Sequence, residues 1–213
     1  MKQLLKTHKS FLLFLLYIPV PLVYFLSQFF LQNHHIIHVA WDDSIPFLPV
    51  FIIPYCIWYL YVPMLMLWVY LKGQKDFPWL MITFFAGVYA CLGIVLLFPS
   101  TITIRPEATG GGFFTAWCHW IFSMDHPVNV FPSMHCFEAL AIHLLTFTFG
   151  PMKEKTTYRI VSAITVVLIC LSTVFVKQHS VIDGIVAVVF AYMVVGISYA
   201  IRKRRSEHDN QTL

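Results

Sequence analysis

The feature that most constrains the fold is a series of six apolar runs separated by polar connections, at about 11–31, 47–71, 79–98, 133–149, 158–176 and 180–201. A helix that crosses a bilayer needs roughly 20 apolar residues, and only the fourth run is clearly shorter than that. Only 11% of the residues are charged, whereas a soluble domain has about 25%. The sequence therefore predicts an all-α membrane protein in which residues 1–213 form a single bundle of six transmembrane helices.

The distribution of Lys and Arg predicts the orientation of this bundle, because cytoplasmic connections carry an excess of basic residues. If the runs cross the membrane alternately, one side receives all but two of the 14 basic residues: Lys2, Lys6, Lys9, Lys72, Lys75, Lys153, Lys155, Arg159, Arg202, Lys203, Arg204 and Arg205. We therefore expect both termini to be cytoplasmic and the connections 32–46, 99–132 and 177–180 to be external. The net charge of +4 then reflects topology and not nucleic-acid binding. The compact size favours a bacterial plasma membrane, while an endomembrane with the site on its lumenal side would give the same topology.

Two further segments have compositions that predict their state. The connection 99–132 contains a Gly110–Gly112 hinge and an aromatic stretch, 113–122, in which Trp117 and Trp120 are typical of a helix lying at the membrane interface. The polar tail 202–213 is predicted to be a disordered, basic cytoplasmic segment.

The five cysteines show no paired spacing, so the sequence indicates neither a disulfide framework nor a zinc site. Cys118 and Cys136 flank the same polar region, which leaves a bridge between them open.

A polar cluster, Lys177, His179 and Asp183, separates the last two apolar runs. An ionisable residue at the centre of a bilayer costs roughly 2.5–3.5 kcal/mol, so such a cluster is a functional hypothesis by default. His179 and Asp183 are four residues apart and share one face if 179–201 is helical. A structural polar pair at a helix end is the alternative interpretation.

The predicted topology brings an anion-binding set to the same external ends. Ser133 follows Pro132 at an expected helix N-cap, where free N–H groups attract anions. Arg105 can hold phosphate oxygens in a bidentate fork. Arg105 and Lys177 are the two basic residues on the external side, so we predict that Arg105, Ser133 and Lys177 bind phosphate.

A second histidine, His135, lies two residues after Ser133. Two histidines can act as nucleophile and general acid, and a carboxylate can orient one of them. We therefore predict His179, His135 and Asp183 as catalytic residues. The set requires no metal, and we expect no cofactor.

Three motifs give these residues a family resemblance. Arg105-Pro106, Pro132-Ser133-Met134-His135 and Ser172-x6-His179-x3-Asp183 are similar, in order and spacing, to the signatures of the type 2 phosphatidic acid phosphatase superfamily, which are Lys-x6-Arg-Pro, Pro-Ser-x-His and Ser-Arg-x5-His-x3-Asp. The resemblance covers about residues 79–201. It implies an integral-membrane lipid phosphate phosphatase without a metal.

Two positions depart from that pattern, because Phe98 stands at the expected Lys and Thr173 at the expected Arg. In this respect the chain resembles the subgroup near inositol phosphorylceramide synthases and sphingomyelin synthases. The acceptor of the phosphoryl group is therefore open between water and a lipid or alcohol hydroxyl.

The resemblance implies a two-step reaction at the two histidines. His179 attacks phosphorus to form a phosphohistidine, His135 protonates the leaving group, and water then releases phosphate. The implied substrates are lipid phosphates or diphosphates of the phosphatidic acid, phosphatidylglycerol phosphate or polyprenyl diphosphate type. The membrane bilayer is the expected surrounding partner.

Other interpretations remain beside this one. His34, His38 and Asp42 have the i, i+4 spacing of a metal site, although a polar loop anchored by Trp41 is the favoured reading. Glu138 lies one turn after His135 and either faces the same pocket or pairs with a polar partner inside the bundle. The roles of His34, His35 and His38 stay open. A di-metal membrane oxidase and a transporter are the distant alternative functions.

Overall fold

The computed structural model describes residues 10–32, 34–72, 75–107, 111–150 and 153–211. The predicted basic cluster at Lys2, Lys6 and Lys9, the first hinge glycine Gly110 and residues 212–213 lie outside the described residues. The described elements, in chain order, are η1 (Leu12–Tyr17), α2 (Pro19–Phe30), β1 (His35–Ile36), α3 (Ala40–Ser44), η2 (Pro49–Phe51), α4 (Ile52–Leu71), α5 (Phe77–Leu97), β2 (Ser100–Thr101), α6 (Phe113–Met124), α7 (Met134–Leu144), the π-helical turn η3 (Leu145–Phe149), α8 (Thr156–Phe175) and α9 (Val181–Gln211).

Five helical segments of the described chain are long and apolar enough to cross a membrane: Leu12–Phe30, Pro49–Leu71, Phe77–Leu97, Thr156–Phe175 and Val181–His208. They correspond to five of the six runs predicted from the sequence. The remaining run forms a shorter apolar helix, Met134–Thr148. The helical character of the chain is therefore confirmed, and five of its helices could cross a membrane by their length and composition.

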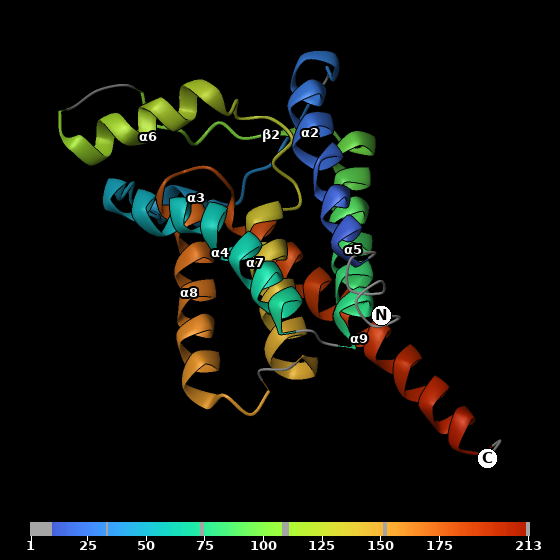
Figure 1. The fold of residues 1–213 in the computed structure, drawn as a ribbon. Coiled ribbons are helices and arrows are strands. Elements are labelled where there is room, and N and C mark those ends of the chain that lie inside the picture. Colours follow the sequence, from blue (N-terminus) through green and yellow to red (C-terminus); the bar gives the residue numbers. More distant parts are fainter. Residues whose placement is uncertain (1–9, 33, 73–74, 108–110, 151–152, 212–213) are drawn as a thin grey trace.

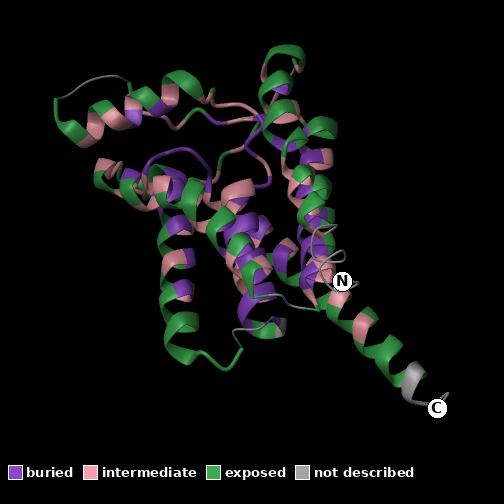
Figure 2. Cartoon of the chain, viewed as in Figure 1, coloured by how far each residue is buried: buried purple, intermediate pink, exposed green. Residues whose placement is uncertain are grey.

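The short helix α7 occupies the centre of the molecule, in contact with α4, α5, α8 and α9. Phe137, Ala139, Ala141 and Ile142 are completely buried along it. Figure 2 shows the buried residues gathered along α7, while the beginning of α8 and the far end of α9 are largely exposed. Other helices therefore cover α7 on several sides, and its N-terminal end lies within the bundle's interior.

Helix α6 lies across one end of the bundle, whereas the C-terminal end of α9 extends from the other end (Figure 1). The buried α6 residues Cys118 and Ile121 pack against Ile52 and Tyr55 at the start of α4. All five cysteines are free thiols, so Cys118 and Cys136 form no bridge.

The connections at the α6 end are linked by a small β structure that the sequence did not predict. Strands β1 and β2 pair in parallel, with His35 opposite Ser100 and Ile36 opposite Thr101. Thr101 also bridges to Val128. This pairing brings the connections 32–46 and 99–132 together beside the start of α7.

The prediction of a disordered tail is wrong for residues 202–211, which continue α9 without a break. Arg, Lys and Glu are good helix formers, and a chain that extends an existing helix does not meet the cost of nucleation. Arg202 is held in addition by an ion pair with Asp76 and by the ring of Trp79, 4.7 Å from its guanidinium carbon.

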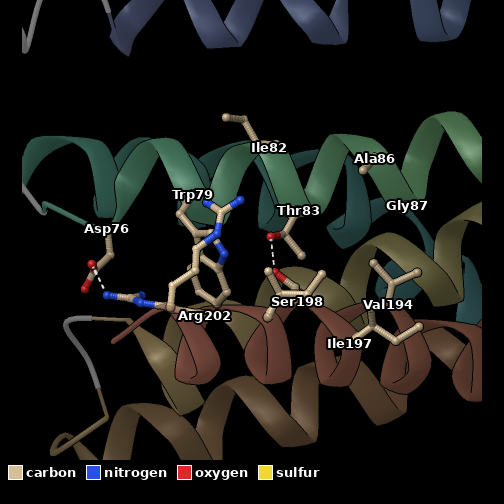
Figure 3. A pocket seen from close by; sticks show the side chains of 12 residues that line it. Asp76, Trp79, Ile82, Thr83, Ala86, Gly87, Val194, Ile197, Ser198 and Arg202 are labelled. Atoms are coloured by element: carbon tan, nitrogen blue, oxygen red, sulfur yellow. Dashed lines mark hydrogen bonds and ion pairs between the residues drawn. The ribbon is translucent and has the colours of Figure 1, made fainter. Parts of the chain in front are cut away.

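A groove of about 510 Å³ lies between α5 and α9. Figure 3 shows the Arg202–Asp76 pair at one end of it and the hydrogen bond between Thr83 and Ser198, 2.6 Å long, further along. These polar contacts fix α9 against α5 and so fix the direction in which the start of α9 enters the bundle.

Candidate active site

The N-terminus of α7 is capped as predicted. The Ser133 hydroxyl oxygen accepts a hydrogen bond from the backbone N–H of Cys136 at 3.4 Å, and Ser133 is completely buried. Its own N–H donates to the carbonyl of Asp183 at 3.3 Å. The second and third sequence motifs, 50 residues apart in the chain, are therefore joined through their backbones.

His179 is held by two acceptors on one side of its ring. Its Nδ1 lies 2.9 Å from the carbonyl oxygen of Val130 and 3.4 Å from Oδ2 of Asp183. A carbonyl can only accept, so Nδ1 carries the proton and, in the neutral ring, Nε2 carries the lone pair. That tautomer is the one a nucleophilic histidine requires.

His135, in the first turn of α7, lies close to His179. The two ring centroids are 5.6 Å apart with planes at 65°. The His135 ring also packs against Trp58, at 4.2 Å between centroids, and Tyr55, at 4.7 Å. Neither of its nitrogens has a hydrogen-bond partner among the described residues, so both are available for a ligand.

The pKa of His179 is raised above its ordinary value. Burial alone lowers it, but the hydrogen bond and the negative charge of Asp183 outweigh that effect, with a contribution from Asp125. The imidazolium form is therefore stabilised, as an intermediate with phosphorus on Nε2 would require.

A non-glycine residue with positive φ precedes each histidine in the sequence. Asn129, with φ 60°, lies before α7 and His135, and Lys177, with φ 58°, lies two residues before His179. Non-glycine residues in this region carry backbone strain that surrounding contacts must hold. At Lys177 the holding contacts include the Thr173 carbonyl, which accepts from the N–H groups of Gln178 and His179 at 2.9 and 3.0 Å.

Asp42 from α3 holds the same turn, a role that the sequence did not reveal. Its carboxylate accepts from the Ser180 hydroxyl at 2.6 Å and from the Val181 N–H at 2.9 Å. Its carbonyl accepts from Lys177 Nζ at 2.7 Å. Burial lowers the pKa of Lys177, and the charges of Asp42 and Asp43 partly oppose that effect. No local pattern could have shown this contact, because it spans 138 positions.

Arg105 lies near the site but is bonded to protein groups. Its Nη1 donates to the Asp125 carbonyl at 2.7 Å, its Nη2 donates to Oε1 of Gln178, and it lies 4.8 Å from the centroid of the Phe122 ring. Burial lowers its pKa, against the charge of Asp125. The phosphate-binding roles of Arg105 and Lys177 stay predictions.

The two positions that depart from the family pattern are used for packing. The Phe98 ring stacks on His35 with centroids 4.4 Å apart and planes at 2°. The Thr173 hydroxyl donates to the Cys170 carbonyl at 2.8 Å and lies 3.7 Å from the Cys136 sulfur. Neither position supplies a cation.

A cavity of about 550 Å³ opens beside the two histidines. It is lined by His135 and His179, by the polar residues Asp125, Asn129 and Glu138, and by many aromatic side chains. Glu138 faces this cavity and also has a polar partner inside the bundle, because it accepts a hydrogen bond from the Tyr17 hydroxyl at 2.9 Å. The cavity thus offers two histidines, two acidic side chains and an amide to a ligand, within largely aromatic walls.

The alternative metal set is not assembled in the described part of the chain. His38 pairs with Asp43 at 2.8 Å, while Asp42 is directed at Ser180 and Val181. No group of three His, Cys, Asp or Glu side chains among the described residues has metal-binding proximity.

Comparisons with family models, with curated proteins and with solved structures find no match to this chain.

Proposed function

We propose that the protein is a membrane enzyme that hydrolyses a lipid phosphate ester through a phosphohistidine at His179. The observation that supports this most is the opposition of His135 and His179 across the wall of one cavity, with centroids 5.6 Å apart. The contacts of His179 Nδ1 with Val130 and Asp183 orient Nε2 for attack.

The chemistry follows from these positions. Nε2 of His179 forms a bond to phosphorus, and the bond from phosphorus to the leaving oxygen breaks as His135 gives that oxygen a proton. Asp183 stabilises the cationic ring. Water then attacks phosphorus, gives a proton to His135, and the P–N bond breaks to release phosphate. The N–H groups at the start of α7 stabilise the phosphoryl oxygens.

The membrane arrangement belongs to the same proposal. Six spans comprise the five long apolar helices and α7 with η3, and α6 lies at the external interface. Both termini are cytoplasmic, and the site opens toward the outer face, in a bacterial plasma membrane. The basic residues Arg202–Arg205 at the far end of α9 support this orientation.

The test is phosphate release from lipid phosphates by the purified protein in detergent with a chelator present. We expect release in the wild type and its loss in His179→Ala and His135→Ala. His38→Ala, a histidine of the alternative metal set, is the matched control and should retain activity. Full activity in His179→Ala, or loss of activity with the chelator, would reject the proposal.

A second function, lipid phosphotransferase, is favoured by one observation: packing contacts occupy Phe98 and Thr173, where the family pattern has cations. The transferase uses the same phosphohistidine and replaces water with a hydroxyl of a lipid or alcohol. A lipid labelled in its phosphate separates the two, since a hydrolase yields labelled inorganic phosphate and a transferase yields a labelled phosphate ester of the acceptor hydroxyl.

A further inference from the structure

The groove between α5 and α9 is separate from the cavity beside the histidines, because the two have no described lining residue in common. Its volume of about 510 Å³ lies within the range of roughly 300–1,000 Å³ that is typical of small-molecule sites. Asp76, just before α5, lies beside Arg202 in the last part of α9 (Figure 3). The groove therefore runs along two helices that are both long and apolar enough to cross a membrane.

Most of the length of the groove is apolar. Its lining includes Ile82, Ala86 and Gly87 on α5 and Val194, Ile197 and Ile201 on α9. The exposed fractions of the three isoleucines are 57%, 58% and 50%. The polar pair in this stretch, Thr83 and Ser198, is joined by its own hydrogen bond of 2.6 Å. Exposed apolar surface of this kind indicates an apolar partner, and in a membrane that partner is an acyl chain.

One end of the groove is basic. Arg202 and Arg205 both line it, since residues three apart on a helix share a face. Asp76 is the one acidic residue among the described lining residues, and it is paired with Arg202. Within the described residues Arg205 forms no ion pair. This end therefore keeps a net positive charge and offers a guanidinium group to an anion.

Trp79 indicates the depth in the membrane at which the basic end lies. Its ring centroid is 4.7 Å from the guanidinium carbon of Arg202. Trp side chains are enriched at the level of the lipid head groups, and basic clusters such as Arg202–Arg205 are enriched just beyond it on the cytoplasmic side. Basic pockets between spanning helices at this depth bind the head groups of anionic lipids.

We propose that the groove binds an anionic phospholipid as a permanent, non-reacting ligand, with its phosphate at Arg205 and one acyl chain between α5 and α9. The guanidinium group of Arg205 donates to the phosphate oxygens, and the acyl chain covers the exposed isoleucines. The lipid adds to the Asp76–Arg202 and Thr83–Ser198 contacts that fix α9 against α5. The inference goes beyond the proposed function and does not depend on a reaction at the histidines.

The test is lipid binding to the full-length protein in detergent micelles, read by native mass spectrometry, which counts the lipids that stay bound to each protein molecule. Phosphatidylglycerol and phosphatidylcholine with the same acyl chains are titrated separately, and inorganic phosphate is the third ligand. The two lipids differ in net charge, and phosphate lacks the acyl chain. His179→Ala is measured beside the wild type, because it changes the other cavity and leaves the groove intact.

We expect phosphatidylglycerol to bind at least about fivefold more tightly than phosphatidylcholine, the factor that one basic residue near the membrane surface contributes. Arg205→Gln should remove most of this preference. Arg204→Gln is the matched control, because it removes the same charge one position away from the groove lining and should keep most of the preference. Both positions are exposed, and Gln is a good helix former, so both variants should fold.

The contribution of the acyl chain is tested by filling the apolar part of the groove. Ala86 and Ala90 are both exposed on α5, but Ala86 lines the groove and Ala90 does not. Ala86→Leu should weaken the binding of phosphatidylglycerol several-fold, and Ala90→Leu should leave it unchanged.

Equal affinities for the two lipids, an equal loss of preference in Arg204→Gln, or full binding in Ala86→Leu would each overturn the inference. Loss of the preference in His179→Ala would place the lipid in the histidine cavity instead. Binding of inorganic phosphate with the same dependence on Arg205 would show a site for a free anion. A lipid-free dimer that Ala86→Leu abolishes would assign the groove to a second copy of this chain.

The outcome for the proposed function is measured separately. The expected lipid preference in a protein without phosphate release would retain the groove site and reject the proposed function. Phosphate release without that preference would do the reverse.

Discussion

At the scale of single residues, the proposed reaction depends on the protonation of His179. Its nucleophilic form is neutral, while the hydrogen bond and charge of Asp183 raise its pKa against the effect of burial. The rate of phosphoryl transfer should therefore rise with pH as His179 loses its proton. The same shift stabilises the folded state below the unfolded pKa of histidine, about 6.5, and that contribution is lost as pH rises through the folded pKa.

Asp183→Asn should lower the rate by about 10²–10⁴-fold, because the orienting carboxylate is removed. It should also move the rising limb of the pH–rate profile to lower pH, since the group that raises the pKa of His179 is gone. A pH series of initial rates measures both effects. The exposed Asp43→Asn serves as the matched control and should keep the wild-type limb; an unmoved limb in Asp183→Asn would contradict the assignment.

Asp42 provides a second residue-scale prediction. Its carboxylate accepts from the Val39 N–H, the Ser180 hydroxyl and the Val181 N–H. In Asp42→Asn the amide group must face one of these donors, so we expect a loss of about 1–3 kcal/mol and a lower kcat as the His179 turn loosens. Thermal unfolding and kinetics of Asp42→Asn and Asp43→Asn, compared side by side, test this. Equal behaviour of the two variants would show that the turn does not depend on Asp42.

At the scale of elements, the position of α7 depends on its close approach to α5. A Cβ at Gly87 would lie 2.2 Å from the ring of Phe137, whereas a Cβ at Gly93 would meet nothing within 4 Å. Gly87→Ala should therefore destabilise the protein by about 1–3 kcal/mol. Gly93→Ala should be neutral or stabilising by up to about 1 kcal/mol, from helix propensity. Denaturant unfolding in micelles measures the free energy of unfolding of both variants. An unchanged free energy in Gly87→Ala would mean that α5 and α7 pack less closely than the structure shows.

The elements also show how far the sequence could predict the molecule. Apolar periodicity and length located the five long helices, and Pro132-Ser133 located the start of α7, because these signals are local. Strands of two residues each, β1 and β2, leave no periodic pattern to detect. The contacts of Asp42 with Ser180, and of Arg105 with Gln178, join segments far apart in the chain. The continuation of α9 was missed because the same charged residues are typical of both disorder and exposed helix.

At the scale of the whole molecule, the proposed topology separates α6 from the end of α9 by the thickness of the bilayer. Figure 1 places them at opposite ends of the bundle. In a cysteine-free background, Ser123→Cys on α6 should react with a membrane-impermeant maleimide added outside intact cells, and Ser206→Cys on α9 should react only after lysis. Labelling of residue 206 in intact cells would reverse the orientation.

The shortness of α7 has a consequence for the path of the substrate. The 11 residues of α7 and the 5 of η3 extend about 24 Å at the α-helical rise, less than the roughly 30 Å of a hydrocarbon core. If the protein acts on a lipid phosphoester in the proposed six-span arrangement, that phosphoester must sink below its neighbours' head groups to meet the histidines, by a distance that the surrounding lipids set. Catalysis should consequently be faster in bilayers of shorter acyl chains, so that membrane thickness itself regulates the rate.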